Sequence, residues 1–312
     1  MTEPAPAPPR RRLRVTVLCG GPSAEREISL DSGRAVADAL RQRGHDVFVS
    51  DVGPDDLAAL DHPADVVFPA LHGPFGEDGT LQRLLEERRI PFVGSGSRAS
   101  AIAMDKVATK LHAICAGVDT PRFEAWDHET LARRQDTDVP LPVIIKPVNQ
   151  GSSVGMLLAR TTADFSGMVR QVVSQFGRAL VEQFVDGDEL TVGIVGPATF
   201  DPVRIHTKAE FFDYQAKYHD DTTEYLFDTG HPESVLMRAR DWSRRVFDRI
   251  GCRHLSRLDW MVDRGGRLWF LEINTLPGFT SHSLVPKAAA RAGIPFDELV
   301  ERLVGMALED AL

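Results

Sequence analysis

The sequence has little cysteine, no surplus of basic residues and no long apolar run. Its three cysteines, Cys19, Cys115 and Cys252, lie far apart without CxxC spacing, which disfavours a disulfide framework or a zinc site and predicts a reducing, cytoplasmic environment. A formal net charge of -9 disfavours nucleic acid or an anionic membrane as the main partner, because both are bound by excess Lys and Arg. Nowhere do about 18 apolar residues run together, so we expect no membrane span. The N-terminal stretch lacks an apolar centre, so we expect no signal peptide.

The remaining composition is typical of a folded enzyme with more than one packed unit. The chain has 312 residues, of which 43% are hydrophobic and 26% charged, enough for two or three units with their own cores. Residues 1–12 are rich in Pro, Ala and Arg, and we expect them to be a disordered tail.

Residues 13–97 alternate short apolar runs with helical patterns. Strand patterns lie at 14–19, 46–51, 65–71 and 90–95, and helical patterns lie between them. Such alternation predicts a parallel α/β domain. Two polar stretches, "GGPSAERE" and "HGPFGEDG", follow the first and third strands, where open α/β sheets bind ligands.

The pattern changes beyond residue 97. Over 98–190 we expect a helix at 104–117 and then strands that follow one another through short turns, which indicates a separate α+β domain with antiparallel pairing. Over 191–312 a long aromatic and charged loop, residues 206–230, precedes a helix and a hairpin. A loop of that length in a compact domain is usually a lid or a binding element.

The hairpin carries an unusual cluster of polar residues. If residues 263–266 form its turn, Val262 pairs with Arg267 and Arg257 stands opposite Glu272. The two-residue period of a strand then places four polar side chains on one face: Arg257, Asp259, Glu272 and Asn274. Oxygen ligands without His or Cys suit Mg²⁺ bound together with nucleotide phosphates. The alternative is a surface Arg–Glu ion pair of little energetic weight.

Two further stretches suggest ligand contacts. Lys146 ends a strand, and the Gly151–Ser153 loop follows it, so backbone N–H groups and a lysine could converge on phosphate; the alternative is a plain hairpin turn. Glu25 could hold a substrate ammonium; alternatively, it only favours a helix N-terminus. The loop is not a Walker A motif, and Gly20–Gly21 lack the rest of a Rossmann fingerprint.

Taken together, these stretches resemble the D-alanine–D-alanine ligases, which are ATP-grasp enzymes. The resemblance runs from about Arg14 to the C-terminus and is carried by "GGPSAEREISLDSG", "PALHGPFGEDGTLQ", "AMDKVATK", "VIIKPVNQGSSVGM", "DYQAKY", "RLDWMV" and "LEINTLPGFTSHSLVP". It implies an ATP-grasp fold that is α/β and α+β: a parallel α/β N-terminal domain, then central and C-terminal domains that clasp ATP between two antiparallel sheets. In the glycine loop, Asn149–Gln150 stand where such ligases usually carry a glutamate.

The resemblance also implies a role for each residue that matches the family's motifs. The catalytic set would be Glu25, Ser152, Tyr218, Arg257 and the Gly278 N–H. The nucleotide would be bound by Lys106, Lys146, Ser153, Glu182, Gln183, Phe184, Val185, Glu189 and Lys217. The amino-acid substrates would contact Glu25, His72, Ser283 and Leu284. Two Mg²⁺ or Mn²⁺ ions would be held by Asp259, Glu272 and Asn274.

The implied reaction joins two D-alanines for peptidoglycan precursor synthesis in the cytoplasm. ATP phosphorylates the carboxylate of the first D-alanine, and the amine of the second attacks the acyl phosphate, so positioning and electrostatics supply most of the rate. The implied partners are ATP, D-alanine and a second copy of the chain in a homodimer. The alternatives are a ligase with another acceptor, chiefly D-lactate, against which Tyr218 argues, and a non-catalytic nucleotide-binding regulator.

Overall fold

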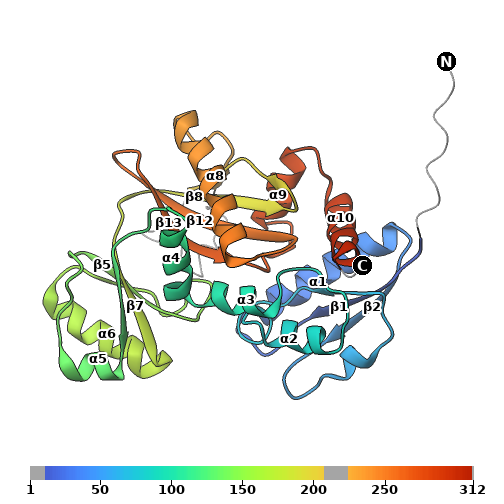
Figure 1. Ribbon diagram of the computed structural model, residues 1–312, viewed down its shortest axis with the longest axis horizontal. Coiled ribbons are helices and arrows are strands. Elements are labelled where there is room, and N and C mark those ends of the chain that lie inside the picture. Colours follow the sequence, from blue (N-terminus) through green and yellow to red (C-terminus); the bar gives the residue numbers. More distant parts are fainter. Residues whose placement is uncertain (1–10, 207–223, 311–312) are drawn as a thin grey trace.

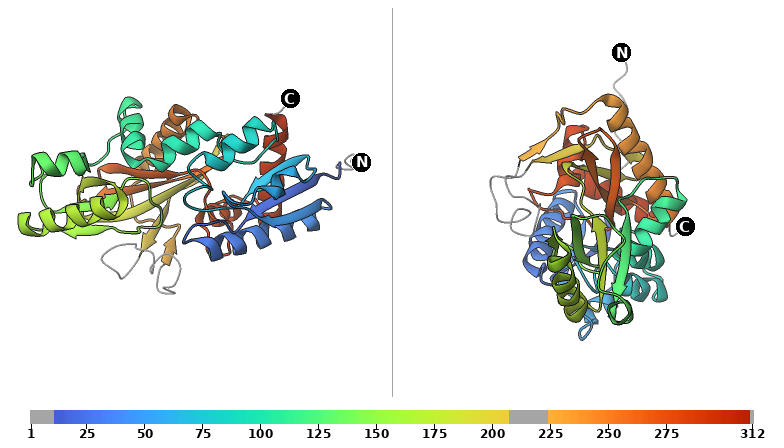
Figure 2. Two further views of the ribbon diagram at one scale, coloured as in Figure 1. Left: turned by 90° about the horizontal axis from the view of Figure 1, so that it is seen from below. Right: turned by 90° about the vertical axis from the view of Figure 1, so that its left-hand side faces the viewer.

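The structure is a computed structural model that describes residues 11–206 and 224–310. Within these ranges the strands form three sheets along the long axis of the molecule (Figure 1). An N-terminal α/β unit lies at one end, a small antiparallel sheet at the other, and a larger antiparallel sheet between them (Figure 2). The predicted combination of one parallel and two antiparallel sheets is confirmed.

The N-terminal unit is a parallel sheet with strand order β2-β1-β3. Its elements are β1 (Arg14–Cys19), α1 (Arg26–Gln42), β2 (Asp46–Asp51), the short 3-10 helix η1 (Ala58–Asp61), β3 (Val66–Pro69) and α2 (Thr80–Glu87). The predicted strand over 90–95 forms only one bridge, between Phe92 and Val67. Because β1 and β3 run parallel and side by side, the polar stretches that follow them meet at one edge of the sheet.

The helix predicted over 104–117 is confirmed as α4 (Lys106–Cys115), and a separate helix, α3 (Ser97–Met104), precedes it. The chain is extended at Asp105, with φ -83° and ψ 104°. The Asp105 carboxylate accepts a hydrogen bond from the Ala108 N–H at 2.9 Å, so it caps α4. This break starts a new helix at Lys106.

The small antiparallel sheet has strand order β4-β7-β5-β6. It contains β4 (Phe123–Asp127), β5 (Val143–Pro147), β6 (Leu157–Ala159) and β7 (Arg178–Gln183), with α5 (His128–Arg133) and α6 (Thr162–Phe176) in the connections. The buried rings of Trp126 and Phe165 meet edge to face at 5.3 Å between centroids and join α6 to the sheet.

The larger sheet has strand order β11-β10-β8-β12-β13, with β9 paired to β8. Its strands are β8 (Gly187–Val195), β9 (Ala198–Thr199), β10 (Val203–His206), β11 (Glu224–Leu226), β12 (Leu255–Asp263) and β13 (Leu268–Asn274). α3, α4 and α8 (Glu233–Ile250) share a buried core with it. α9 (Leu284–Arg291) and α10 (Phe296–Glu309) return to the N-terminal unit, where α10 packs beside α1 (Figure 1).

The register predicted for the β12–β13 hairpin is wrong. Val262 pairs with Leu268, not Arg267, and Arg257 pairs with Asn274, not Glu272. The turn holds one more residue than predicted, and a β-bulge at Leu271 adds another residue to β13. Without this bulge, Glu272 would point to the opposite, core-facing side of the sheet. The bulge therefore keeps Glu272 opposite Asp259, and the predicted grouping of the four polar residues on one face is confirmed.

Several predictions concern regions outside the described residues or are left open by the fold. Lys217, Tyr218 and most of the predicted disordered tail lie outside the described residues. The division into 13–97, 98–190 and 191–312 remains a prediction, and its second boundary falls inside β8. None of the helices in the described part of the chain is long and apolar enough to cross a bilayer.

Two glycines allow a test of the packing between α2 and α3. Gly79 and Gly44 have the same positive φ of +89°, but a Cβ on Gly79 would lie 2.3 Å from the Ser97 carbonyl oxygen, whereas a Cβ on Gly44 would have no atom within 4 Å. We expect Gly44→Ala to cost ~1–2 kcal/mol from backbone strain alone. Gly79→Ala should cost ~1–3 kcal/mol more, because steric overlap is added. Urea unfolding of both variants measures the difference, and equal losses would contradict this packing.

Candidate active site

Two adjoining pockets lie between the sheets, and Lys106, Gln150 and Glu272 line both. Every predicted site residue that the structure describes lines one or both of them. The first pocket contains Glu25, His72, Lys106, Ser152, Arg257, Glu272, Asn274, Gly278, Ser283 and Leu284. The second contains Lys106, Lys146, Ser153, Glu182, Gln183, Phe184, Val185, Glu189, Asp259 and Glu272. Residues of the N-terminal unit and of both antiparallel sheets thus converge on one continuous site.

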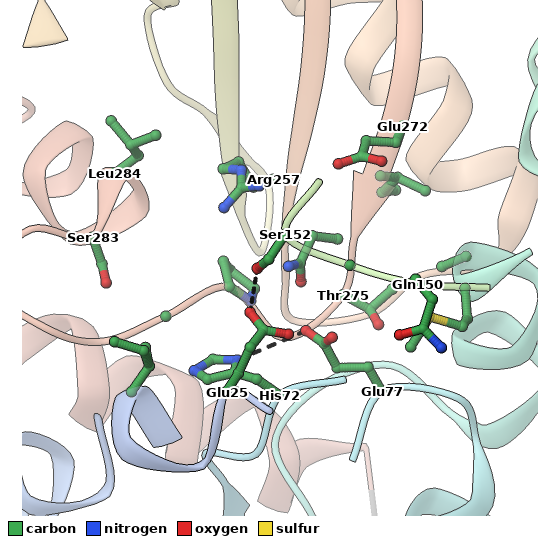
Figure 3. A pocket seen from close by; sticks show the side chains of 18 of the residues that line it. Glu25, His72, Glu77, Gln150, Ser152, Arg257, Glu272, Thr275, Ser283 and Leu284 are labelled. Carbon is green, nitrogen blue, oxygen red and sulfur yellow. Dashed lines mark hydrogen bonds and ion pairs between the residues drawn. The ribbon is translucent and has the colours of Figure 1, made fainter. Parts of the chain in front are cut away.

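The first pocket joins the N-terminal unit to the glycine-serine loop. The Ser152 hydroxyl donates a hydrogen bond to Glu25 Oε1 (Figure 3). Ser152 and Ser153 both have positive φ angles, 50° and 57°, which are uncommon for residues other than glycine. Such local backbone strain is often found at functional sites. The hydrogen bond connects residues 127 positions apart in the sequence.

A buried histidine and glutamate, His72 and Glu77, lie beside Glu25 in the same pocket (Figure 3). His72 Nδ1 and Glu77 Oε1 are 3.8 Å apart, and the Gly73 N–H donates to Glu77 Oε2 at 2.8 Å. Burial opposes a charge on His72, but the nearby carboxylates of Glu77 and Glu25 raise its pKa. Burial is the main cause that raises the pKa of Glu77, and Glu25 adds to it. The charge of Glu25 therefore favours the protonated form of His72 and disfavours a second carboxylate charge on Glu77.

The four polar residues of the hairpin lie between the two pockets. Arg257 binds Asp259 through two N–H groups at 3.0 and 2.9 Å, and the Thr191 hydroxyl donates to Asp259 at 2.8 Å. Asn274 Oδ1 accepts the Leu276 N–H at 2.8 Å, which stabilises the irregular chain after β13. Arg257 therefore forms an ion pair with Asp259, and Arg257 and Glu272 both line the first pocket.

This donor set fits a hard divalent cation completed by other oxygen ligands. The described residues contain no group of three His, Cys, Asp or Glu that could hold a metal. The hairpin instead presents two carboxylates and one amide, Asp259, Glu272 and Asn274, where the two pockets adjoin. Mg²⁺ is commonly bound by one or two carboxylates plus substrate phosphates and water, so these residues fit such an ion.

The second pocket has a set of buried charges along one wall. Lys146 Nζ lies 2.8 Å from Glu182 Oε2, and Lys110 forms an ion pair with Glu182 Oε1. Lys106 Nζ lies 3.3 Å from Glu272 and donates to the Gln150 carbonyl oxygen at 2.6 Å. Gln150, in the stretch where the resembled ligases usually carry a glutamate, thus binds Lys106 through its backbone oxygen.

The pKa shifts in this wall follow from burial and pairing. Burial opposes ionisation of Glu182, but the charges of Lys110 and Lys146 outweigh it and lower its pKa. Burial also opposes the charge on Lys146, but Glu182 and Glu272 raise its pKa. For Lys110 burial prevails over Glu182 and lowers the pKa to about 8. The carboxylate of Glu182 is therefore held in its ionised form.

Sequence reasoning missed Glu77 and Lys110. Glu77 follows His72 by five residues within "HGPFGEDG", the polar stretch after the third strand. Lys110 follows Lys106 by four residues, a spacing that places both on one face of a helix. That spacing is the signal that could have identified Lys110, although only the structure shows that it reaches Glu182.

Comparison with known proteins is consistent with this site. Two family models match the chain: D-ala D-ala ligase N-terminus over residues 50–95 and D-ala D-ala ligase C-terminus over residues 116–305. A D-alanine--D-alanine ligase of Chromohalobacter salexigens is 43% identical over 297 residues, which cover 95% of this chain and 94% of the relative. One from Nitrosospira multiformis is 42% identical over 295 residues, covering 94% and 96%.

Solved structures share the fold. A D-alanine--D-alanine ligase from Bacillus anthracis complexed with ATP has a TM-score of 0.81 at 26% identity, covering 96% of this chain and 98% of that one. The VanG D-Ala:D-Ser ligase from Enterococcus faecalis has a TM-score of 0.84 at 24% identity, covering 95% and 100%. At that identity the second likeness shows the fold alone.

The three sheets and the pocket between the two antiparallel ones define an ATP-grasp ligase. The family models and the relatives above 40% identity are more specific than the fold. The chain belongs to the D-alanine–D-alanine ligase family. The predicted fold class, enzyme class and family are thereby confirmed.

The buried wall of the second pocket generates a pH-dependent prediction. Near pH 7, Glu182→Gln should lower the free energy of unfolding by ~3–5 kcal/mol, because it leaves two buried lysines without their carboxylate. The pKa of Glu182 is lowered in the folded protein, so its contribution is complete above its unfolded pKa of ~4.5 and is lost as the pH falls through the folded value. The difference between wild type and variant should therefore shrink in acid.

Urea unfolding at pH ~7 and at pH ~4 measures this difference. Glu298→Gln is the matched control, because it removes a carboxylate from a partly exposed pair with Arg302 on α10 and should have little effect at either pH. A Glu182→Gln loss that stays constant with pH would show that the carboxylate charge is not what stabilises the wall.

Proposed function

We propose that the chain joins two D-alanines into D-alanyl-D-alanine with ATP, through a D-alanyl phosphate intermediate, for peptidoglycan precursor synthesis. The observation that carries this proposal is the junction of the two pockets at Lys106, Gln150 and Glu272. A carboxylate bound in the first pocket would face phosphates bound in the second. Phosphoryl transfer between two bound substrates needs such a shared boundary.

In the first pocket, Glu25 would bind the ammonium of the first D-alanine, and His72 would lie near it. Ser152 would hold Glu25 in place through its hydrogen bond. A positive charge on His72, which its raised pKa favours, would offset the negative charge of Glu25 when a zwitterion binds. These roles need no nucleophilic side chain, because the amine of the second substrate is the nucleophile.

The acceptor side of the same pocket would stabilise the tetrahedral intermediate and orient the second D-alanine. Arg257 and the Gly278 N–H would bind the developing oxyanion, and Ser283, with Leu284 beside it, would contact the acceptor carboxylate. A Cβ on Gly278 would lie 2.8 Å from Ser283 Oγ, so glycine allows these two groups to approach each other. Donors fixed in this way require little reorganisation during the reaction.

In the second pocket, different residues would bind different parts of the nucleotide. Lys106, Lys146 and Ser153 would bind phosphates. The adenine would be received by Glu182, Gln183, Phe184 and Val185, and the ribose hydroxyls by Glu189. Bound Mg²⁺ or Mn²⁺ would neutralise charge on the transferring phosphoryl group. Asp259, Glu272 and Asn274 would hold two such ions, with Glu272 shared between them.

Further parts of the proposal rest on the sequence resemblance. Lys217 would reach the γ-phosphate, and Tyr218 would join the Glu25–Ser152 network; both lie outside the described residues. We also propose a homodimer, a three-domain division and a cytoplasmic location, the last because the reaction consumes ATP.

We expect phosphate release from ATP to require a divalent cation and D-alanine, with D-alanyl-D-alanine as the product. Phosphate and product would be measured with D-alanine, L-alanine, D-serine and D-lactate, each alone and paired with D-alanine. Rapid dipeptide formation from L-alanine would contradict the substrate. A preference for D-lactate as acceptor would identify the ester-forming alternative, and no turnover with any pair would favour the non-catalytic regulator.

Glu272→Gln tests the metal assignment, because it keeps the shape but removes a charge. We expect kcat to fall ~10²-fold or more and the Mg²⁺ requirement to rise, as for loss of a main electrostatic stabiliser. Glu129→Gln, which removes a carboxylate from an exposed pair with Arg133, is the control and should leave turnover intact. Turnover near the wild-type rate at ordinary Mg²⁺ would refute the role of Glu272.

A further inference from the structure

Lys110 is a fully buried charged residue that does not line either pocket. It lies in α4, one helical turn after Lys106, where α4 packs against β13 and close to β7 (Figure 1). A buried lysine is costly unless its charge is paired and its N–H groups are bonded. None of the roles described above uses it.

Three oxygen acceptors surround the Lys110 ammonium. It forms an ion pair with Glu182 Oε1, donates to Thr120 Oγ1 at 2.7 Å, and lies 3.3 Å from the Phe270 carbonyl oxygen. An ammonium has three N–H donors, so these acceptors match its capacity. The Phe123 ring lies 5.7 Å from Nζ on a further side. The Lys110 ammonium therefore contacts other protein groups and can influence a bound ligand only through one of these partners.

The partner that faces the nucleotide pocket is Glu182. Its side chain is 3% exposed and lies between two lysines, with Oε1 toward Lys110 and Oε2 2.8 Å from Lys146. Lys146 and Glu182 line this pocket, but Lys110 does not. Lys110 therefore contacts the Glu182 carboxylate on the side away from the pocket. Lys110 also joins β7 of the small sheet to β13 of the larger sheet through Glu182 and Phe270.

We propose that Lys110 is a positioning residue that keeps Glu182 ionised and oriented, and thereby selects adenine over 6-oxopurines in the nucleotide pocket. This inference rests on the proposed function in taking Glu182 as part of the adenine site. An ionised carboxylate is only an acceptor. It accepts from the exocyclic amino group of adenine and repels the O6 carbonyl of hypoxanthine or guanine at the same ring position.

Loss of Lys110 would change the hydrogen-bonding character of Glu182. With one lysine instead of two, the buried carboxyl would be protonated more readily, because burial disfavours its charged form. A protonated carboxyl is also a donor and can bond to the O6 of hypoxanthine. Discrimination between ATP and ITP would then decrease, although Lys110 touches neither nucleotide.

The test is the ratio of ITP to ATP dissociation constants, measured by calorimetry without D-alanine. We expect Lys110→Met to reduce this ratio about tenfold or more, the order expected for one charge-assisted hydrogen bond. Lys110→Arg should restore most of the ratio because it keeps the charge. Since the readout is binding and not dipeptide synthesis, it decides the role of Lys110 even if the acceptor chemistry differs from that proposed.

Thr120→Val separates positioning from a purely structural role. It removes one acceptor of the ammonium but retains the Lys110–Glu182 ion pair. We expect it to lower the thermal midpoint without changing the ITP to ATP ratio. If Thr120→Val and Lys110→Met reduce the ratio in proportion to their loss of stability, Lys110 only holds the two sheets together and the proposal is wrong.

A double-mutant cycle with Glu182→Gln keeps the test valid if Lys110→Met alone does not fold. Replacing both members of a buried pair is tolerated better than removing one. In the Glu182→Gln background, Lys110→Met should leave the nucleotide ratio unchanged, because Lys110 is proposed to act only through the carboxylate. A further change of the ratio in that background would show another route and overturn the proposal.

Discussion

The buried ion pairs around Glu182 are the constraint on which the site depends. A carboxylate at 3% exposure is tolerated only because Lys110 and Lys146 approach it from two sides. Those lysines come from α4 and β5, and Glu182 comes from β7, so the charge balance requires these elements to meet at one point. Because Lys110 also donates a hydrogen bond to the Phe270 carbonyl oxygen, β13 of the larger sheet must lie at the same point.

The position of the two pockets follows from this junction. β13 continues from Phe270 to Glu272, which lies opposite Asp259 and close to Lys106. The break between α3 and α4 starts the helix at Lys106, so one helix supplies both the lysine shared by the pockets, Lys106, and the lysine paired with Glu182, Lys110. The N-terminal unit then closes the first pocket with Glu25 and His72. The chain that follows β13 reinforces this arrangement, because α9 and α10 share a core with β1 and α1.

Much of the architecture was predictable from the sequence. The three strands of the N-terminal sheet were placed correctly, and the antiparallel pairing in the rest of the chain was predicted, because the apolar patterns are strong and the turn residues between them are distinctive. The family was recognisable from several motifs in order. The helix predicted over 104–117 is present as α4, but the hairpin register was wrong, because an added strand residue has little effect on an apolar pattern.

By itself, the sequence determined which residue types were available: oxygen ligands on a hairpin, a lysine before a glycine-serine loop, and carboxylates after parallel strands. Period-two patterning could group Asp259 and Glu272 on one face because side-chain alternation is a local property. Only the tertiary structure decided that Leu271 bulges to keep Glu272 on that face, that Lys110 pairs with Glu182, and that Glu77 lies beside His72. The physical reason is that a buried charge acquires its partners from elements distant in sequence, and their approach is set by the packing of whole sheets and helices.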